Sequence, residues 1–588
     1  MSATIQLLGA PAILRDGQKT AGPKGRKAWA LLAYLLLAER PAGRRAMAEF
    51  LFADAADPLG ALRWNLAQLR RALDGVATIE GDPVRVTLAP DVTVDAHSPA
   101  AGGDLLEGIE LDTSPAFASW LVVARGRYAG QAAAALHDGA LHALTSGDAD
   151  RAADLAAQLV ALDPFDEQHH ELLVRALVAR GDRTGAVEQV EACRRLFRRE
   201  LDCEPSAALR QAASETAGTD AAPVTGRHTV ALARLEAGEA ALAAGAAEHG
   251  VNLLRQACRE ADACGDDALH GRALLHLGGA LVEAVRGRDE EGALCLHQAL
   301  ALAESAGDRE TIVGALRELA YTDLQAGRRT SVEQRLMRAG HLATSDRERA
   351  SILAVQGQNR SDMGDYPGAL SSLTQSIEQA ERAGEPRRVA FSMSLVGRIH
   401  LLRGDDADAI TMLDRSLEIT EAERWLAFLP WPEALRAEAD LRQGETARAA
   451  DRLHRAFALA CDLQDPCWEG MAARGLSLLD RAEGEPGRSW IDEARVRCGR
   501  LTDRYVWVQG HVLDAAISVE LDAGDHESAA THIRSLRALA ARTEMRELVV
   551  RSLVHAAHLG DRGAVTSARV LAAEIENPVL GALVEAHA

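Results

Sequence analysis

Glycine recurs at a regular interval through the C-terminal part of this 588-residue sequence. Intervals of 40 residues separate Gly364, Gly404, Gly444, Gly484 and Gly524, and intervals of 36 to 42 residues extend the series to Gly245, Gly287, Gly327 and Gly560. Glycine adopts the left-handed backbone that ends many helices, so the series predicts tight turns between paired helices. Two-helix units cannot bury their apolar faces alone and stack into a superhelix with a concave groove. Residues 229–588 are therefore predicted to form a solenoid of about nine hairpins.

A shorter helical repeat precedes the solenoid. Gly147-Asp148 and Gly181-Asp182 lie 34 residues apart, which is the period of a tetratricopeptide repeat. In each pair the glycine permits the turn, and the aspartate caps the helix that follows. Residues 98–212 are therefore predicted to be helical. Residues 213–228 are mostly small and polar and are predicted to be a linker.

The first 97 residues have a mixed pattern. Residues 5–14 predict a short β pair, and residues 76–80 and 84–88 alternate around Gly81-Asp82-Pro83 as a hairpin does. Helices are predicted in the segment after Pro23, at residues 44–52 and at residues 58–74. These are the elements of a winged helix, assigned to residues 1–97. The predicted fold class is mainly α, with an N-terminal α/β winged helix followed by tetratricopeptide-like repeats that form an α-solenoid.

The helix at residues 58–74 is amphipathic. A 3.6-residue period places Leu62, Leu66, Leu69 and Leu73 on one face, which is expected to meet a core. The other face and its flanks carry Arg63, Trp64, Gln68, Arg70 and Arg71. Arginine and glutamine are able to hydrogen-bond base edges in the major groove of DNA. A surface helix with arginines that only serve solubility is the alternative.

Charge is unevenly distributed along the chain. The formal net charge is -21. Residues 1–75 contain 11 Lys and Arg against 6 Asp and Glu, so this part carries +5 and the remainder carries -26. A protein that coats nucleic acid with its whole surface is excluded by this balance. A small anion-binding head on an acidic body is favoured instead.

The N-terminal residues resemble a known family. The segments LLGAPAILRDG, KGRKAWALLAYLLLAER, LFAD and LRWNLAQLRRALD are similar to the OmpR-type winged helix of the Streptomyces antibiotic regulatory proteins, or SARP activators. The resemblance implies that the third helix enters the major groove of double-stranded DNA, with Arg63, Trp64, Gln68 and Arg71 as base or groove contacts and Arg70 beside them. It also implies phosphate contacts from Arg85 in the wing and from Lys24, Arg26, Lys27, Arg44 and Arg45.

Two details of this head stay open. The hairpin tip is acidic at Glu80 and Asp82, whereas the family's wings are basic. The indole of Trp64 either contacts a thymine methyl group or packs against the wing.

The following segment resembles a second family domain. The run from Gly147 to Arg210, with LVALDPFDE, the two Gly-Asp turns and ELDCEPS, is similar to the bacterial transcriptional activator domain. A winged helix followed by this domain is the SARP arrangement, and together they cover residues 1 to 212. The resemblance implies an activator that contacts RNA polymerase. The activator domain is expected either to make this contact or to pair two protomers as a homodimer.

Aromatic residues are concentrated in the middle of the solenoid. Trp425, Phe428, Trp431 and Trp468 fall within 44 residues, near Arg398, His400 and Arg436. Aromatic walls with a few polar groups are typical of small-molecule or peptide pockets. The alternative is that large core residues fill an irregular repeat around Pro430 and Pro432. The 40-residue period resembles the arrays of MalT-type regulators, but no GxxxxGK[ST] phosphate loop precedes it.

Other classes of site are not supported by the sequence. The eight cysteines lack zinc-site spacing, and no third ligand lies near the adjacent His169 and His170, of which one is expected to be solvated and the other packed. No catalytic motif, signal peptide or membrane-length apolar stretch is found, so we expect a cytoplasmic non-enzyme without cofactor or metal. Two functions follow: a DNA-binding transcriptional regulator controlled through its solenoid, or an interaction scaffold whose winged helix has lost DNA affinity.

Overall fold

The computed structural model describes residues 1–588 except 1, 39–41, 98–102, 112, 202, 215–226, 244–245, 286, 501–504 and 588. The chain forms two compact units. The first contains residues 1–132 and 526–588, and the second contains residues 133–525. Helix α4 (Pro115–Thr145) contributes residues to both units. In the described part of the chain, no helix is long and apolar enough to cross a membrane.

The N-terminal sheet has four strands in the order β3-β2-β1-β6. Strands β1 (Ala3–Gln6), β2 (Ala12–Arg15) and β3 (Gln18–Thr20) are antiparallel neighbours, and β6 (Val92–Val94) pairs parallel to β1. The predicted pair around Gly9 is therefore present. The sequence analysis missed β3 and β6, because three-residue strands are too short to show alternation.

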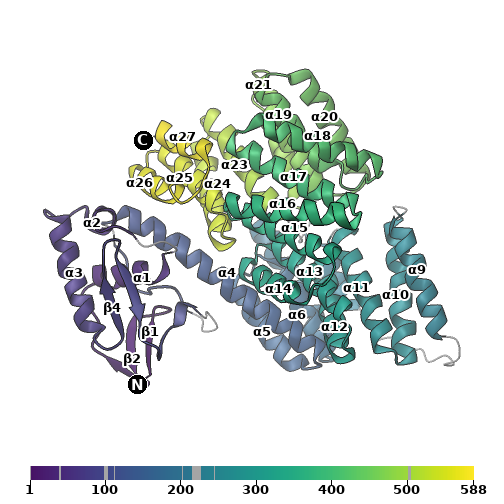
Figure 1. Ribbon diagram of the computed structural model, residues 1–588, viewed down its shortest axis with the longest axis horizontal. Helices are drawn as coiled ribbons and strands as arrows, with labels where there is room; N and C mark the ends of the chain where they lie inside the picture. Colours follow the sequence, from purple (N-terminus) through teal and green to yellow (C-terminus); the bar gives the residue numbers. More distant parts are fainter. Residues whose placement is uncertain are drawn as a thin grey trace. The chain divides into compact units, whose positions relative to one another are not determined.

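Three helices and a hairpin complete a winged helix. They are α1 (Arg26–Leu37), α2 (Arg44–Phe52), α3 (Pro58–Ala72), β4 (Ala77–Glu80) and β5 (Arg85–Leu88). The hairpin register pairs Ile79 with Val86, and a short 3-10 helix at Asp95–His97 follows β6. In Figure 1 these elements form the purple part of the ribbon, with α3 at its margin. The predicted winged helix is thus observed.

The core of the winged helix extends past residue 97, where the domain was predicted to end. The ring centres of Phe117 and Trp120 in α4 lie 5.4 Å apart. Phe117 contacts the ring of Phe50, and Trp120 contacts the ring of Tyr34. Ser114 Oγ donates a hydrogen bond of 2.7 Å to the carbonyl of Leu51. The start of α4 is therefore part of the core that supports α1 and α2.

Residues after α4 form the expected short helical repeats. The helices are α5 (Ala149–Leu162), α6 (Glu167–Ala179), α7 (Arg183–Leu201) and α8 (Ala207–Ser214). Gly147 and Gly181 have φ of 79° and 85°, and Asp148 accepts a hydrogen bond from the backbone N–H of Arg151. The Gly-Asp turns thus act as predicted. The predicted linker lies mostly outside the described residues.

The expectation that one histidine of the pair is solvated is wrong. His170 is buried and hydrogen-bonds the carbonyl of Pro164 and the side chain of Gln189. The His169 side chain is only 12% exposed, and its Nδ1 lies 3.2 Å from the carbonyl of Asp163. Both rings are held by the Asp163–Asp166 turn, which the helical wheel does not reveal.

The remaining residues are helical repeats. In the described part of the chain, helices α9 to α27 follow one another; α9 to α23 lie in the second compact unit and α24 to α27 in the first, so the predicted array of about nine hairpins is not one continuous unit. Their bounds are α9 Arg227–Ala243, α10 Ala247–Cys264, α11 Asp267–Glu283, α12 Asp289–Ala306, α13 Arg309–Ala326, α14 Arg329–Leu342, α15 Asp346–Asp362, α16 Tyr366–Ala383, α17 Pro386–Arg403, α18 Asp406–Ala422, α19 Pro430–Arg442, α20 Thr446–Asp462, α21 Pro466–Ala482, α22 Arg488–Cys498, α23 Val506–Asp522, α24 His526–Arg542, α25 Arg546–His558, α26 Arg562–Ala572 and α27 Pro578–Ala586. Figure 1 shows α15 to α18 packed side by side.

Close helix contacts repeat with the 40-residue period. A Cβ atom on Gly357 would lie 2.5 Å from Leu373 Cγ, and a Cβ atom on Gly397 would lie 2.6 Å from Leu413 Cγ. In these two hairpins the paired helices therefore approach so closely that only a hydrogen atom fits at the glycine. Of the nine marker glycines, the eight that are described have positive φ, while Gly245 lies outside the described residues.

Candidate functional site

Helix α3 combines a buried face with a stable start. Asp57 accepts a hydrogen bond of 2.9 Å from the backbone N–H of Gly60, and Pro58 occupies the first turn, where a missing N–H costs nothing. All four leucines of the predicted stripe, at positions 62, 66, 69 and 73, are at most 1% exposed. This burial fixes which side of the helix faces away from the core.

The opposite face of α3 is open to solvent. The Arg63 side chain is 69% exposed and Trp64 is 58% exposed, while Gln68 is half-buried. Arg63 lies 3.5 Å from the carboxylate of Asp57, a long contact that leaves its other nitrogens accessible. Trp64 is too exposed to be covered by the wing. The three side chains form a polar and aromatic ridge with the size and donors to contact base edges.

Two other arginines of α3 make contacts within the domain. Arg70 donates a hydrogen bond of 2.8 Å from Nε to the carbonyl of Ile79 in β4, and Arg71 donates from Nε to Ala67 in its own helix. Both residues remain exposed. Arg70 therefore positions the wing relative to α3, a role that sequence spacing did not reveal.

The acidic wing tip also has a structural role. Asp82 accepts a hydrogen bond of 2.9 Å from the backbone N–H of Arg44 at the start of α2. The Arg44 guanidinium donates back to the carbonyl of Gly81, at 3.1 and 3.2 Å. Arg44, which the family resemblance assigns to phosphate, thus holds the hairpin tip. Arg85 is exposed, and its side chain has no hydrogen-bond partner among the described residues.

The remaining predicted phosphate contacts differ in availability. Lys27 forms an ion pair of 2.5 Å with Asp54 and lies 5.5 Å from the Phe52 ring centre, so it is partly engaged. Its hydrogen bond is the main cause that lowers the pKa of the Asp54 carboxyl. Arg45 is 90% exposed and contacts Glu49 along α2.

Lys24 and Arg26 lie at the start of α1, where both are exposed. Their helix has Gly25 as N-cap and therefore no side-chain cap for its first N–H groups. Backbone N–H groups at a helix start attract anions, and the two cations add to this attraction. This end of α1 is thus suited to a phosphate.

The candidate ligand residues of the solenoid form two separate groups. Trp425 and Phe428 stack with ring centres 4.3 Å apart, and Phe391 lies 5.8 Å from Phe428. Trp431, only 2% exposed, packs 5.0 Å from Trp468 and 5.6 Å from Trp507. Trp431 and Trp507 are buried inside the solenoid, whereas Trp425 and Trp468 are half-buried.

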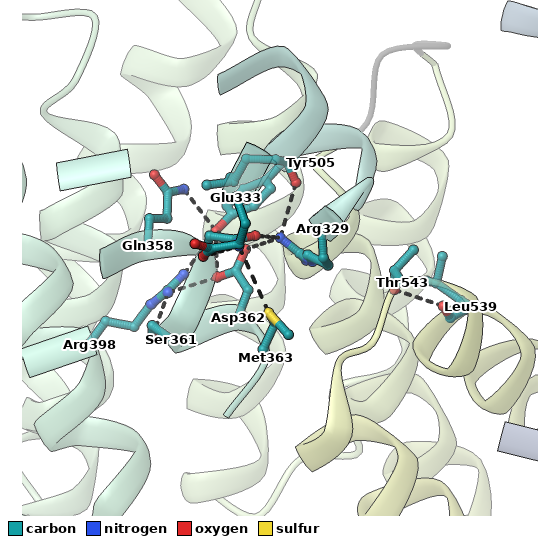
Figure 2. Close-up of polar contacts among 12 residues, drawn as sticks. Arg329, Glu333, Gln358, Ser361, Asp362, Met363, Arg398, Tyr505, Leu539 and Thr543 are labelled. Atoms are coloured by element: carbon teal, nitrogen blue, oxygen red, sulfur yellow. Dashed lines mark hydrogen bonds and ion pairs between the residues drawn. The ribbon is translucent and has the colours of Figure 1, made fainter. Parts of the chain in front are cut away.

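Arg398 is fully buried at the centre of a polar cluster. Its guanidinium donates hydrogen bonds to Ser361, to Asp362 and to the hydroxyl of Tyr505, each of 2.8 or 2.9 Å. Arg329 also pairs with Asp362, at 3.3 Å. Figure 2 shows these side chains pointing toward one another from α14, α15, α17 and the start of α23. Tyr505 was expected only as one of the clustered aromatic residues, and Asp362 was not singled out, because these partners of Arg398 lie 107 and 36 residues away in sequence.

The other polar candidates are also paired. Arg436 is 3% exposed and bonds Asp440 and Asp414. His400 lies 3.5 Å from Asp405 at the end of α17. Arg398 and Arg436 are thus structural partners of carboxylates in this conformation, whereas His400, Trp425 and Trp468 are half-buried.

Comparisons with known proteins agree with this domain order. Residues 93–216 match the bacterial transcriptional activator domain, and residues 348–422 match a tetratricopeptide repeat model. No curated protein matches the sequence. These matches confirm the resemblance drawn from the sequence to a bacterial transcriptional activator domain followed by tetratricopeptide repeats.

Several solved structures are similar in fold. A Rap protein complexed with Competence and Sporulation Factor has a TM-score of 0.41 at 12% identity, covering 61% of this chain and 90% of its own. Aspartyl phosphate phosphatase F from Bacillus subtilis has a TM-score of 0.37 at 10% identity, covering 70% and 94%. Mycobacterium tuberculosis EmbR in complex with a low affinity phosphopeptide has a TM-score of 0.28 at 18% identity, covering 36% and 64%.

Proposed function

We propose that this chain is a sequence-specific, DNA-binding transcriptional activator that a ligand or protein on the solenoid controls. The observation that carries the proposal is the exposed face of α3, where Arg63, Trp64 and Gln68 project from a helix whose leucine face is buried. The match to the activator domain family supports the regulatory role. As such an activator, the protein would act in the cytoplasm and would catalyse no reaction.

In this mechanism α3 lies in the major groove, which is wide enough to admit a helix. Arg63 donates to a guanine edge, Gln68 pairs with an adenine edge, and Trp64 contacts a thymine methyl group. Lys24, Arg26 and Arg85 contact phosphates, which adds affinity and salt dependence but no sequence choice. The activator domain then recruits RNA polymerase, and two protomers bind paired half-sites as a homodimer.

Selection from random duplex DNA tests the proposal. The full-length chain is expected to enrich one motif. Arg63→Ala and Gln68→Ala are each expected to weaken binding to that motif by about 1 to 3 kcal/mol and to relax the choice of base at one position. Arg415→Ala is the matched control, because Arg415 is an exposed arginine on α18 of the solenoid. Unchanged affinity and selectivity in both α3 variants would refute the assignment of α3.

The alternative is an interaction scaffold whose winged helix no longer binds DNA. The contacts of Arg44 with the wing and of Lys27 with Asp54 favour it, since they occupy two of the expected phosphate contacts. Failure of the wild-type chain to select any motif would support this alternative.

The solenoid supplies the controlling signal in the proposal. An effector, either a small molecule or a peptide, would contact the half-buried Trp425. Its ring stacks on Phe428, and its ring centre lies 5.7 Å from the Arg387 guanidinium. Native mass spectrometry of protein purified from its own host would detect a bound effector. If a Trp425→Ala variant still copurifies with the same effector, Trp425 is not part of the effector site.

A further inference from the structure

Buried polar side chains join the activator domain to the solenoid. His137 of α4 lies with Nε2 2.8 and 3.0 Å from the two carboxylate oxygens of Glu290 in α12. The two side chains are 4% and 2% exposed. They are 153 residues apart in sequence, so the contact is tertiary and belongs to no repeat.

The next residue of α4 makes a second charged contact. Asp138 accepts hydrogen bonds from Arg335 at 2.5 Å and from Ser331 at 3.3 Å, both in α14. Arg335 also donates to Asp323 at 2.7 Å, and Asp323 accepts from Arg328 at 2.7 Å. Acidic and basic groups therefore alternate from the activator domain into the solenoid. We call the contacts of His137 and Asp138 with Glu290, Ser331 and Arg335 the α4 clamp.

Apolar packing surrounds the α4 clamp. Leu141 and Leu172 of the activator domain belong to one buried cluster with Val282, Leu296 and Leu319 of the solenoid. The α4 clamp is thus the polar part of a continuous interface within residues 133–525.

The interface is not optimised for permanent closure. Among the described residues, His137 Nδ1 and His297 Nε2 are buried atoms without a hydrogen-bond partner. A buried polar atom without a partner is destabilising, and a buried ion pair contributes specificity while adding little net affinity over apolar groups. Permanent interfaces are mostly apolar. The buried polar contacts therefore select one docking geometry and lower the stability of the closed state, while the surrounding apolar cluster supplies most of the affinity.

We infer that the α4 clamp is an autoinhibitory contact, which holds the activator domain on solenoid helices α12 to α14 until a solenoid ligand releases it. The inference rests on the proposed function. It names α12 to α14 as the intramolecular partner of the activator domain, and it assigns His137, Asp138, Glu290 and Arg335 to the switch rather than to DNA or effector binding.

Two variants of the full-length chain test this inference in opposite directions. Glu290→Gln keeps the size of the side chain and removes its charge, which weakens the pair with His137. The double variant His137→Leu with Glu290→Met replaces the pair by apolar groups, which closes the contact more firmly. Glu304→Gln is the matched control, because Glu304 lies on the same helix α12 in an ion pair with Arg338 whose side chains are 42% and 50% exposed.

Hydrogen exchange of residues 133–145 measures opening of the contact. We expect exchange on the order of tenfold faster in Glu290→Gln, slower exchange in the double variant, and wild-type exchange in Glu304→Gln. Transcription in vitro from a promoter carrying the selected motif is expected to rise without effector in Glu290→Gln and to fall in the double variant. Misfolding would lower transcription in both, so opposite effects are diagnostic.

Each other outcome is informative. Wild-type exchange in Glu290→Gln, or faster exchange with no rise in transcription, would overturn the autoinhibitory role. A wild-type chain that selects no DNA motif would instead refute the proposed function, and the exchange data would still decide whether the α4 clamp opens.

Discussion

The hydroxyl of Tyr505 is hydrogen-bonded inside the solenoid. Its removal should lower the stability of the helices around it. The oxygen accepts hydrogen bonds of 2.9 Å from both Gln358 and Arg398, and it donates at 3.0 Å to Asp362. Burial is the main cause that raises the pKa of Tyr505, so the phenol stays protonated and remains a donor. All of its hydrogen-bonding capacity is therefore used.

Tyr505→Phe removes these bonds without creating a large cavity. Two involve charged partners, and a bond of this kind contributes about 1.5 to 3 kcal/mol. The simple sum overestimates the loss, because Arg398 keeps Ser361 and Asp362 as partners. We expect the opening free energy of this region to fall by about 2 to 4 kcal/mol.

Hydrogen exchange by mass spectrometry is the suitable assay, because a chain of several units does not unfold in one step. Peptides from α15 and α17 should exchange roughly 30 to 1,000 times faster in Tyr505→Phe, since each 1.4 kcal/mol is tenfold. Glu418→Gln is the control, because Glu418 is 65% exposed in its ion pair on α18. Equal exchange of α15 and α17 in wild type and Tyr505→Phe would refute the reasoning.

Three further predictions concern the repeats and the DNA-binding head. Gly357→Ala should lower the melting temperature, because the new Cβ would lie 2.5 Å from Leu373 Cγ. In the control Gly340→Ala the new Cβ meets nothing within 4 Å, so the melting temperature should rise slightly. Equal shifts in the two variants would contradict the close packing at Gly357. Glu348 has a pKa lowered to about 2, because the N–H groups of Ser345 and Thr344 and the Arg309 guanidinium outweigh the effect of burial, which raises it. A lowered pKa stabilises the fold above the unfolded value of roughly 4.3 and loses this effect as pH falls. Glu348→Gln should therefore be less stable than wild type by roughly 1 kcal/mol at pH 7. In thermal melts this difference should vanish near pH 2. A difference that does not change with pH would argue against the capping role of Glu348. Lys24→Ala should weaken binding to all DNA sequences alike and reduce the slope of log affinity against log salt by roughly 0.9, and an unchanged slope would remove Lys24 from the phosphate contacts.

Local periodicity determined much of this protein. The leucine stripe of α3 and the glycine turns are visible in the sequence, because a helix places every third or fourth residue on one face and because glycine accepts positive φ at low cost. The exposed position of Trp64 follows from the same stripe. The close approach of Gly397 to Leu413, in contrast, is visible only in the tertiary structure.

Tertiary structure decided which charged side chains remain available. Arg44 and Asp82 meet across the wing, Arg398 meets Tyr505 across the solenoid, and His137 meets Glu290 between domains. Sequence spacing cannot reveal such pairs, since their partners lie 38 to 153 residues away and depend on how successive repeats turn around the superhelix axis. A candidate arginine is thus a DNA or ligand contact only if folding leaves part of its guanidinium accessible, as it does for Arg63, whereas burial with a carboxylate removes Arg398.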